Sequence, residues 1–509
     1  MLTWRRLHVK VRAAHAPLTS RLVTRQHAWT HGHLTSCLKL STSTALRKDF
    51  FKDVETTFVE MKKKAADALP SSNWSPFYIN PNLPPERADI VIVGGGVMGW
   101  SIAYWLKKME NSRNGMRVVV VEKDPVYTQA STVLSAGGIR QQFSLPENIL
   151  LSLASADFLR NVNEHLNVYN EDPVDLQFNQ SGYLFLANEK VAHIMEENYH
   201  IQSQFGAQVS LLSPTQLQER FPWINTDGVA LASYGLENEG WFDPWSLLNG
   251  FKRKAISLGV IPCTGKVTDF DYTVTLAHMY DQDVMVRRVK SVKVQMPNSP
   301  EYQPVECAIV INAAGAFSAK VTEMLRVGSG DKYSIDGIPF PVEPRKRYIY
   351  VFNCPDGPGL DTPFLIDYSG VYFRREGLGG NYIGGASPDE ENEPDAGNLD
   401  VDHDFFVEKV WPELAHRVPS FEKLKVTSSW AGFYDYNTLD QNAIIGVHPL
   451  INNMYCATGF SGHGLQHSPG VGRALAELIL KGGFETLDLS VFGLDRIMKQ
   501  EPVLERNIL

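Results

Sequence analysis

Residues Ile90–Gly99, with the sequence IVIVGGGVMG, decide the fold of this 509-residue chain. Ile90–Val93 is short, apolar and β-branched, which is typical of a buried strand. The glycine run that follows fits the pattern G-x-G-x-x-G, and Trp100–Lys108 is expected to form a helix. Val118–Val121 is a second apolar strand, and it ends at Glu122. The stretch therefore predicts a strand–turn–helix–strand unit.

Each part of this unit has a task in a dinucleotide-binding fold. Gly94 makes the tight turn, Gly96 lets the backbone approach a pyrophosphate, and Gly99 lets the helix pack close to the strand. The helix N-terminus offers free N–H groups and a positive dipole end to the phosphates. Glu122 lies 23 residues past Gly99, near the spacing of about 20 for a carboxylate that binds ribose hydroxyls. Nucleotide binding is predicted, with a glycine-rich turn in an unrelated α/β domain as the alternative.

A membrane span is a competing interpretation of the same stretch. Ile90–Leu106 contains 17 residues and no charge, so a hydropathy window could mark it as transmembrane. The three consecutive glycines, with Asp89 before the stretch and Lys107 after it, favour a buried β-α unit. We therefore expect no span here.

The charge of the chain is unevenly distributed. It has 48 Lys and Arg against 57 Asp and Glu, a formal charge of −9. Residues 1–48 hold nine Lys or Arg and no acidic residue, so the remainder carries −18. Such an acidic body is not built to bind phosphate backbones, and no nucleic acid is expected as a partner. The Arg-, Ser- and Thr-rich composition of residues 1–48 is typical of a mitochondrial transit peptide, with a disordered basic tail as the alternative.

Other stretches constrain the organisation of the chain. Five scattered cysteines without C-x-x-C spacing argue against a disulfide scaffold or a metal site and suit a reducing compartment. Asp49–Leu69 has apolar residues at helical spacing, which predicts a helix packed on its own domain or docked on a membrane surface or partner. Pro70–Pro85, with five prolines, predicts a linker. Asp389–Asp404 holds eight acidic residues and no Lys or Arg, which predicts a solvated loop without a chemical role.

Four stretches occur in an order that resembles one enzyme family. They are Gly94–Gly99 with Glu122, Gly240–Pro244, Ile309–Ser318 and Gly459–Gly472. Together they are similar to the D-amino-acid oxidase and sarcosine oxidase family of FAD enzymes, which includes dimethylglycine and sarcosine dehydrogenases. The resemblance covers about Asp89 to Leu480. It implies an α/β chain, α+β overall, with a Rossmann-like FAD-binding domain built from separated segments and a substrate domain with a mixed sheet.

The expected domain boundaries follow from this resemblance and from composition. Residues 1–48 form the transit peptide and 49–87 the helix and proline-rich linker. The FAD-binding segments are 88–180, 239–335 and 429–509, the last with a C-terminal tail, and the substrate domain is formed by 181–238 and 336–428.

The resemblance implies FAD as the cofactor and a role for each motif. Gly94, Gly96 and Gly99 would take the pyrophosphate, and Glu122 the adenosine ribose. Ser131 and Thr132 would lie beside phosphate and flavin, and Val267 in a strand whose backbone meets the adenine. Ala314 and Gly315 would form a second flavin-contacting turn. Gly459, Gly462 and Gly464 would lie under the isoalloxazine, where N–H groups and the following helix stabilise negative charge on the reduced ring.

The same resemblance implies an amine or amino-acid-like substrate, because flavin accepts a hydride equivalent from a C–H next to an amine nitrogen. Arg140 is the candidate carboxylate clamp, since a guanidinium binds a carboxylate bidentately and an Ile-Arg pair does this in sarcosine oxidases. A surface or phosphate-facing arginine is the alternative. Tyr348 and Tyr434, with Tyr436, are candidates to line the pocket, or else belong to the core. His463 is a candidate to polarise the flavin or touch the substrate, or is satisfied within its turn.

Three departures from the family pattern carry consequences. Covalent-flavin members have a histidine near Leu134 or a cysteine near Gly432–Phe433, and neither is present here, so non-covalent FAD is predicted. Gln466 stands where sarcosine oxidases hold substrate with a lysine, which puts simple N-methylglycine chemistry in doubt. Lys346 is a candidate oxygen-activating lysine or a charge on the surface of a strand.

A narrower resemblance, carried by Ser131–Ile139, Pro341–Tyr348 and Trp430–Asn442, is to a mitochondrial flavoprotein of this family associated with assembly of respiratory complex I. It implies a place on the matrix side of the inner membrane, with peripheral membrane association at most. It also implies complex I assembly intermediates as partners. The hypotheses are therefore an oxidoreductase or an assembly factor in which FAD is mainly structural. An NAD-dependent dehydrogenase is a third, which the C-terminal flavin turn disfavours.

Overall fold

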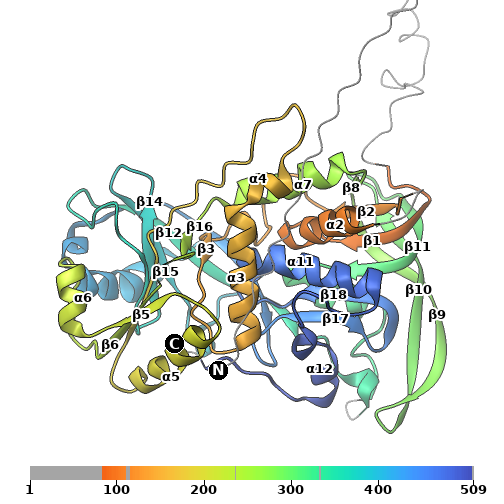
Figure 1. Ribbon diagram of the computed structural model, residues 1–509. Coiled ribbons are helices and arrows are strands. Elements are labelled where there is room, and N and C mark those ends of the chain that lie inside the picture. Colours follow the sequence, from red (N-terminus) through yellow and green to blue (C-terminus); the bar gives the residue numbers. More distant parts are fainter. Residues whose placement is uncertain (1–82, 111–114, 236, 332–333, 507–509) are drawn as a thin grey trace, which may run out of the picture. The chain divides into compact units, whose positions relative to one another are not determined.

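The computed structural model of the chain describes residues 83–110, 115–235, 237–331 and 334–506. The predicted transit peptide, the helix at Asp49–Leu69 and most of the linker lie outside the described residues. The remaining elements form two large sheets and the helices that cover them (Figure 1). This arrangement confirms the predicted α/β class with a second, mixed sheet.

The first sheet is built around β1 (Arg87–Val93), as the opening stretch predicts. Its parallel strands lie in the order β8 (Ile261–Thr264), β2 (Val118–Glu122), β1, β11 (Tyr302–Asn312) and β18 (Ile451–Thr458). β17 (Ile444–His448) pairs antiparallel with β18. β9 (Lys266–Met279) and β10 (Gln282–Gln295) form an antiparallel meander that leads into β11. Three sequence segments build this sheet, namely residues 87–122, 261–312 and 444–458, and the strands of the second sheet come between them in the sequence.

The turn after β1 requires two of its glycines for steric reasons. Gly94 has φ +105°, and a Cβ there would lie 2.3 Å from the carbonyl oxygen of Ala313. A Cβ on Gly99 would lie 2.0 Å from the carbonyl oxygen of Gly94, so α2 (Val97–Met109) could not pack against the turn. Both glycines therefore bring the helix N-terminus up to the carboxyl ends of β1 and β11.

Helices cover one face of the first sheet, and the meander covers part of the other. α2, α7 (Pro244–Ser257), α11 (Gly464–Lys481) and α3 (Pro146–Arg160) contribute to one apolar core that includes Trp100, Phe251 and Leu475. α7 begins after Asp243, whose carboxylate accepts the N–H groups of Trp245 and Ser246. The core on the other face is rich in valines from the meander.

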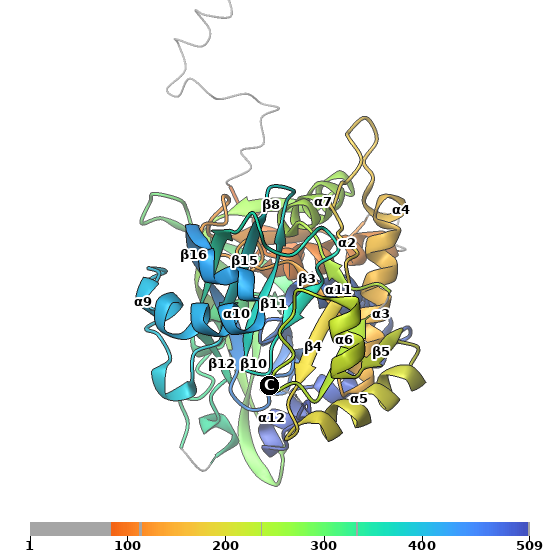
Figure 2. The same cartoon turned by 90° about the vertical axis from the view of Figure 1, so that its left-hand side faces the viewer.

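The second sheet comes from residues 183–235 and 342–437. Its strand order is β16 (Lys425–Asn437), β12 (Val342–Asn353), β15 (Asn381–Ala386), β14 (Val371–Glu376), β13 (Phe364–Ile366), β4 (Tyr183–Ala187), β6 (Leu231–Gly235) and β5 (Val209–Leu212). β13 and β4 are parallel and the other neighbours antiparallel, so the sheet is mixed. Figure 2 views this part of the molecule, with α5 (Ala192–Gln204), α6 (Pro214–Arg220) and α10 (Trp411–Arg417) around the sheet. β16 runs across the boundary expected at residue 429.

Short elements connect the two sheets. β3 (Gly138–Ile139) pairs with β7 (Gly240–Trp241). The helix expected over Leu145–Leu166 is two helices, α3 and α4 (Val162–Leu166), because Asn161 leaves the helical conformation at φ −104° and ψ 26°. α8 (Ser318–Glu323) follows the second glycine turn, and α12 (Asp495–Lys499) precedes the C-terminal tail. Within the described ranges, no helix has the length and apolar character needed to cross a membrane.

Candidate active site

A cavity of about 430 Å³ runs from the first glycine turn to the second sheet. At one end it is lined by Gly96, Glu122 and Tyr127, and in the middle by Thr132, Ala314 and Gly315. At the other end it is lined by Arg140, Tyr434 and His463, with Gly462 and Gly464 of the turn before α11. Most of the predicted cofactor-binding and catalytic residues, including Ser131, therefore meet at one site.

The first glycine turn and Glu122 form the end of the cavity nearest α2. Glu122 accepts the N–H of Gly95 at 2.8 Å and that of Asp124 at 2.9 Å. Burial raises the pKa of Glu122, and these two backbone bonds oppose that shift. A Cβ on Gly96 would have Thr132 Oγ1, at 3.4 Å, as its nearest neighbour, so the backbone of Gly96 is open to the cavity.

The middle of the cavity lies between the segment at Ser131–Thr132 and the turn at Ala314–Gly315. Thr132 Oγ1 accepts the N–H of Val97 at 3.2 Å, which satisfies one of the free donors at the start of α2. Gly315 has φ +53°, and a Cβ there would meet no protein atom within 4 Å. Its backbone is therefore free to lie against a ligand.

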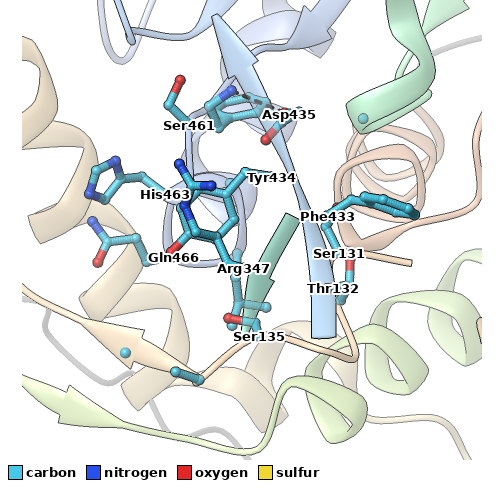
Figure 3. A pocket seen from close by; sticks show the side chains of 18 of the residues that line it. Ser131, Thr132, Ser135, Arg347, Phe433, Tyr434, Asp435, Ser461, His463 and Gln466 are labelled. Atoms are coloured by element: carbon cyan, nitrogen blue, oxygen red, sulfur yellow. Dashed lines mark hydrogen bonds between the residues drawn. The ribbon is translucent and has the colours of Figure 1, made fainter. Parts of the chain in front are cut away.

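The last glycine turn lies against the end of β16. Gly462 has φ +99°, and a Cβ there would lie 2.8 Å from the ring of Tyr434. Asp435 Oδ2 accepts the N–H of Phe460 at 3.0 Å, and its backbone oxygen accepts the N–H of Ser461 at 3.2 Å. Burial raises the pKa of Asp435 to about 6, against the effect of its backbone hydrogen bonds. Figure 3 shows Asp435 and Ser461 together, with Tyr434 beside them.

Arg140 lies in the wall of the cavity just after β3. Its Nη1 donates to the carbonyl of Gln142, and its Nη2 lies 3.0 Å from His463 Nε2. The guanidinium stacks on Phe143, with Cζ 4.2 Å from the ring centroid, and on Phe185 at 5.0 Å. Among the described residues, no carboxylate forms an ion pair with it. The charge of Arg140 is therefore available to an anionic ligand.

His463 is bound to Arg140 and is neutral. Its Nε2 accepts the Arg140 N–H, so the ring proton is on Nδ1. Burial lowers the pKa of His463 well below 6.5, and the charge of Arg140 and the neighbouring His467 lower it further. In this arrangement His463 orients Arg140 and does not serve as a proton donor at neutral pH.

Gln466 lies beneath Arg140 in the first turn of α11. Its Oε1 accepts the backbone N–H of Arg140 at 3.0 Å, and its Nε2 donates to Ser152 Oγ at 3.0 Å. In Figure 3, His463 and Gln466 lie on one side of Tyr434, and Phe433, Ser131 and Thr132 on the other. The polar atoms of Gln466 are therefore used to hold Arg140 in place.

Some predicted residues do not line the cavity. Tyr348 was expected in the pocket, but it packs in the core of the second sheet, with its ring centroid 5.7 Å from that of Phe405. The reason is strand alternation: the preceding residue, Arg347, lines the cavity, so Tyr348 faces the opposite side of β12. Lys346 shares the Tyr348 side and donates to Asn398. The other predicted residues outside the lining are Gly94, Gly99, Val267, Tyr436 and Gly459.

Other cavity residues were missed from the sequence. Arg347 lies over the ring of Tyr434, with its Cζ 5.5 Å from the ring centroid, and donates two hydrogen bonds to Glu393, both at 2.8 Å. Asp435 and Glu505 also line the cavity. Asp435 follows Tyr434 directly, and this adjacency was a signal that could have been used. Nothing in the local sequence of Glu505 indicates its position.

Comparisons with known proteins agree with this geometry. The family model described as "FAD dependent oxidoreductase" matches residues 89–478. The chain belongs to this family. A FAD-dependent oxidoreductase domain-containing protein 1 of Xenopus laevis is 66% identical, over 91% of this chain and 93% of that protein. The Bos taurus protein of the same name is 59% identical, over 88% and 93%. The crystal structure of L-proline dehydrogenase from P. horikoshii has a TM-score of 0.67 at 28% identity, covering 82% of this chain and all of that one.

The cofactor of this FAD-dependent oxidoreductase is FAD, and the cavity fits it. Open backbone at Gly96 and Gly315 allows close approach of a ligand at two separate turns. Glu122 stands at the end where an adenosine ribose would lie, and the turn at Gly462–Gly464 at the end where the flavin ring would lie. Of the described residues that line the cavity, none is a cysteine, and the one histidine is bound to Arg140. Non-covalent attachment stays a prediction that these contacts support.

Proposed function

We propose that this FAD-dependent oxidoreductase oxidises an amine that carries a carboxylate, and that Arg140 binds the carboxylate. The observation that supports this most directly is the guanidinium of Arg140, which lines the cavity and forms an ion pair with no carboxylate in the part of the chain that the structure describes. A second observation is that several similar proteins are dehydrogenases of N-methylated amino acids: a dimethylglycine dehydrogenase of Rattus norvegicus is 26% identical, over 79% of this chain and 44% of that protein.

The residues around Arg140 prepare it for this task. Gln466 fixes its backbone, His463 and the Gln142 carbonyl orient the guanidinium, and Phe143 supports it from one face. A side chain held in this way loses little conformational freedom when a ligand binds. Burial lowers the pKa of Arg140, but a guanidinium remains charged at neutral pH.

When bound, FAD supplies the acceptor for a hydride equivalent from the carbon next to the amine nitrogen. The chain contributes orientation and exclusion of water. A carboxylate on Arg140 would place the rest of a small substrate between Tyr434 and the turn at Gly462–Gly464, because all of these residues line the same part of the cavity. The free N–H groups of that turn and the start of α11 are suited to stabilise negative charge.

The test is to mix the FAD-loaded protein with N-methylated amino acids under anaerobic conditions and to follow the oxidised flavin band. Bleaching is expected with at least one member of the panel. Arg140→Gln should weaken binding of the reactive substrate roughly 10- to 100-fold, as expected for loss of a charged hydrogen bond worth about 1.5–3 kcal/mol. Arg160→Gln, an exposed arginine of α3, is the matched control. Absence of bleaching across a wide amine panel would contradict the proposal.

We further propose that the protein acts on the matrix side of the mitochondrial inner membrane, with complex I assembly intermediates as partners. The acid-free, Arg-rich composition of residues 1–48 and the narrower resemblance described above support this. The alternative function is that of an assembly factor in which FAD is mainly structural. Replacing Arg140 in cells and measuring flavin content, amine turnover and complex I level together separates the two. A fall in complex I with unchanged flavin content supports a role for substrate chemistry, and an unchanged complex I level supports the alternative.

A further inference from the structure

The C-terminal tail returns to the cavity after α12. In Figure 1 it runs from α12 past the end of α3 to α5. Glu505 and Arg506, the last two described residues, line the same cavity as Arg140. Glu505 is partly buried and Arg506 is exposed, so the cavity reaches the surface at this point. The tail is therefore the outer boundary of the site beyond Arg140.

Glu505 is held at the start of α3 by four donors. Its Oε2 accepts the N–H of Ser144 at 2.7 Å and the Ser144 hydroxyl, and its Oε1 accepts the N–H of Leu145 at 3.3 Å and Asn148 Nδ2 at 2.6 Å. Negative charge is favoured at a helix N-terminus. The same Ser144 hydroxyl accepts the N–H of Arg506 at 2.7 Å. Phe143, on which Arg140 stacks, directly precedes this contact.

The rest of the tail is fixed to two other parts of the chain, the turn after β16 and α5. Val503 donates its N–H to Asp440 at 3.1 Å, and its carbonyl accepts Asn442 Nδ2 at 2.7 Å. Asn198 of α5, which lines the cavity, donates to the carbonyl of Arg506 at 2.9 Å. The tail thus joins the start of α3, α5 and the turn after β16 around one opening.

We propose that residues 503–506 form the end wall of the substrate site and limit the length of the ligand that Arg140 can hold. This inference rests on the proposed role of Arg140 as the carboxylate site. The wall presents the carboxylate of Glu505, whose oxygens are already engaged by donors, and beside it Arg506, whose guanidinium is paired with the carboxylate of Glu197. A ligand of limiting length would therefore meet a rigid, negatively charged group, and a second carboxylate at its far end would be repelled.

The test measures binding of straight-chain carboxylates to the FAD-loaded protein through the visible spectrum of the flavin. The probes are acetate, butanoate, hexanoate and octanoate. In the unaltered protein, affinity should stop rising at an intermediate length. With the chain ended at Gln500, or with Glu505→Ala if the shortened chain does not hold FAD, the rise in affinity should continue to longer acids, by at most roughly fourfold for each methylene that stays buried. Acetate affinity and FAD content should stay the same. Glu501→Gln, an exposed tail residue that does not line the cavity, is the control.

A second readout separates charge from length. Pentanoate and glutarate have the same chain length, and glutarate has a carboxylate at each end. Glutarate should bind at least tenfold more weakly than pentanoate in the unaltered protein, and Glu505→Gln should reduce that difference.

Each possible result supports or overturns the inference. If acetate binds but the length profile is unchanged in the altered proteins, the end wall is wrong and the role of Arg140 stands. If the affinities for all ligands fall equally and FAD content falls with them, the tail is a structural support and the inference fails. If no carboxylate perturbs the flavin in the unaltered protein, the role of Arg140 fails, and the end wall fails with it.

Discussion

Gln466 and Arg140, 326 residues apart in the sequence, are joined by a hydrogen bond of 3.0 Å from the Arg140 backbone N–H to the Gln466 side-chain oxygen. The other end of the same amide donates to Ser152 of α3. A residue that seemed from the sequence to replace a substrate-binding lysine thus ties β3, α11 and α3 together. Gln466 contributes to the site by holding the backbone of Arg140, and with it the guanidinium, in position.

Replacing Gln466 by Leu should disturb both stability and ligand binding. The change leaves the Arg140 N–H and the Ser152 hydroxyl without their partner in a buried place, which costs about 1–3 kcal/mol. Urea unfolding of the FAD-loaded protein measures the change in stability. The dissociation constant of acetate measures the change in ligand binding at Arg140. Gln208→Leu, an exposed position, is the control. Unchanged acetate binding would show that Gln466 does not position Arg140.

Asp435 should make stability depend on pH between about 4 and 6. Burial raises its pKa from 3.8 in the unfolded chain to about 6 in the folded protein. The contribution of Asp435 to stability is therefore fully present below about pH 4 and is lost as the pH rises through 6. The difference of about two pKa units corresponds to a loss on the order of 3 kcal/mol.

Asp435→Asn removes this titration and keeps an acceptor for the Phe460 N–H. We expect the variant to gain stability over the unaltered protein as the pH rises from 4 to 6, with a constant difference above pH 7. Free energies of unfolding measured across this range check the sign. A variant that is less stable at pH 8 by more than it is at pH 5 would contradict the assignment of the charge.

Gly315→Ala should weaken FAD binding without unfolding the protein. The added methyl group meets no protein atom within 4 Å, but it projects where Gly315 lines the cavity. The positive φ adds a cost of roughly 1–2 kcal/mol to any L residue. Gly482→Ala is the matched control, because Gly482 also has a positive φ and an open Cβ position but ends α11 outside the cavity. FAD dissociation constants compare the two, and equal effects would show that the Gly315 methyl group does not contact FAD.

Non-covalent attachment of FAD predicts that acid precipitation releases the cofactor into solution. Leu134, Gly432 and Phe433 line the cavity, and the family resemblance places the histidine or cysteine of covalent members near these residues. None of these side chains can form a bond to the flavin. Absorbance of the supernatant at the flavin wavelengths is the measurement, and flavin that stays in the protein pellet would refute the prediction.

Local patterns predicted the elements that hold the cofactor but not all of their limits. α11 contains Pro469, a residue type that usually ends a helix. The helix instead starts at Gly464 and passes through Pro469. Pro469 has no N–H to donate to the carbonyl of Leu465. That carbonyl accepts a hydrogen bond from the hydroxyl of Ser468 at 2.9 Å instead. Side chains of α2 also bond to this turn, with Ser101 and Trp105 donating to the carbonyls of Ser468 and Pro469.

Contacts between distant parts of the chain could not be predicted in this way. The acidic stretch Asp389–Asp404 was expected to be a solvated loop without a chemical role, and its contacts were not predicted: Glu393 accepts hydrogen bonds from both Arg345 and Arg347. β9 extends past Phe270 to Met279 because its ladder with β10 goes on, although exposed residues such as Thr273 and Thr275 interrupt the apolar pattern there. Pairing of this kind depends on the fold as a whole.

The end of β16 has a consequence for how the molecule can open. Asp435 bonds to Phe460 and Ser461, and the Asn437 N–H donates to the Ser461 hydroxyl at 3.0 Å. β16, the last strand of the second sheet in the sequence, is thus hydrogen-bonded to the turn at the flavin end of the cavity. A hinge motion that parted the two sheets here would break these three hydrogen bonds between β16 and the turn. We therefore expect a ligand to enter and leave the site at its rim and not between the two sheets.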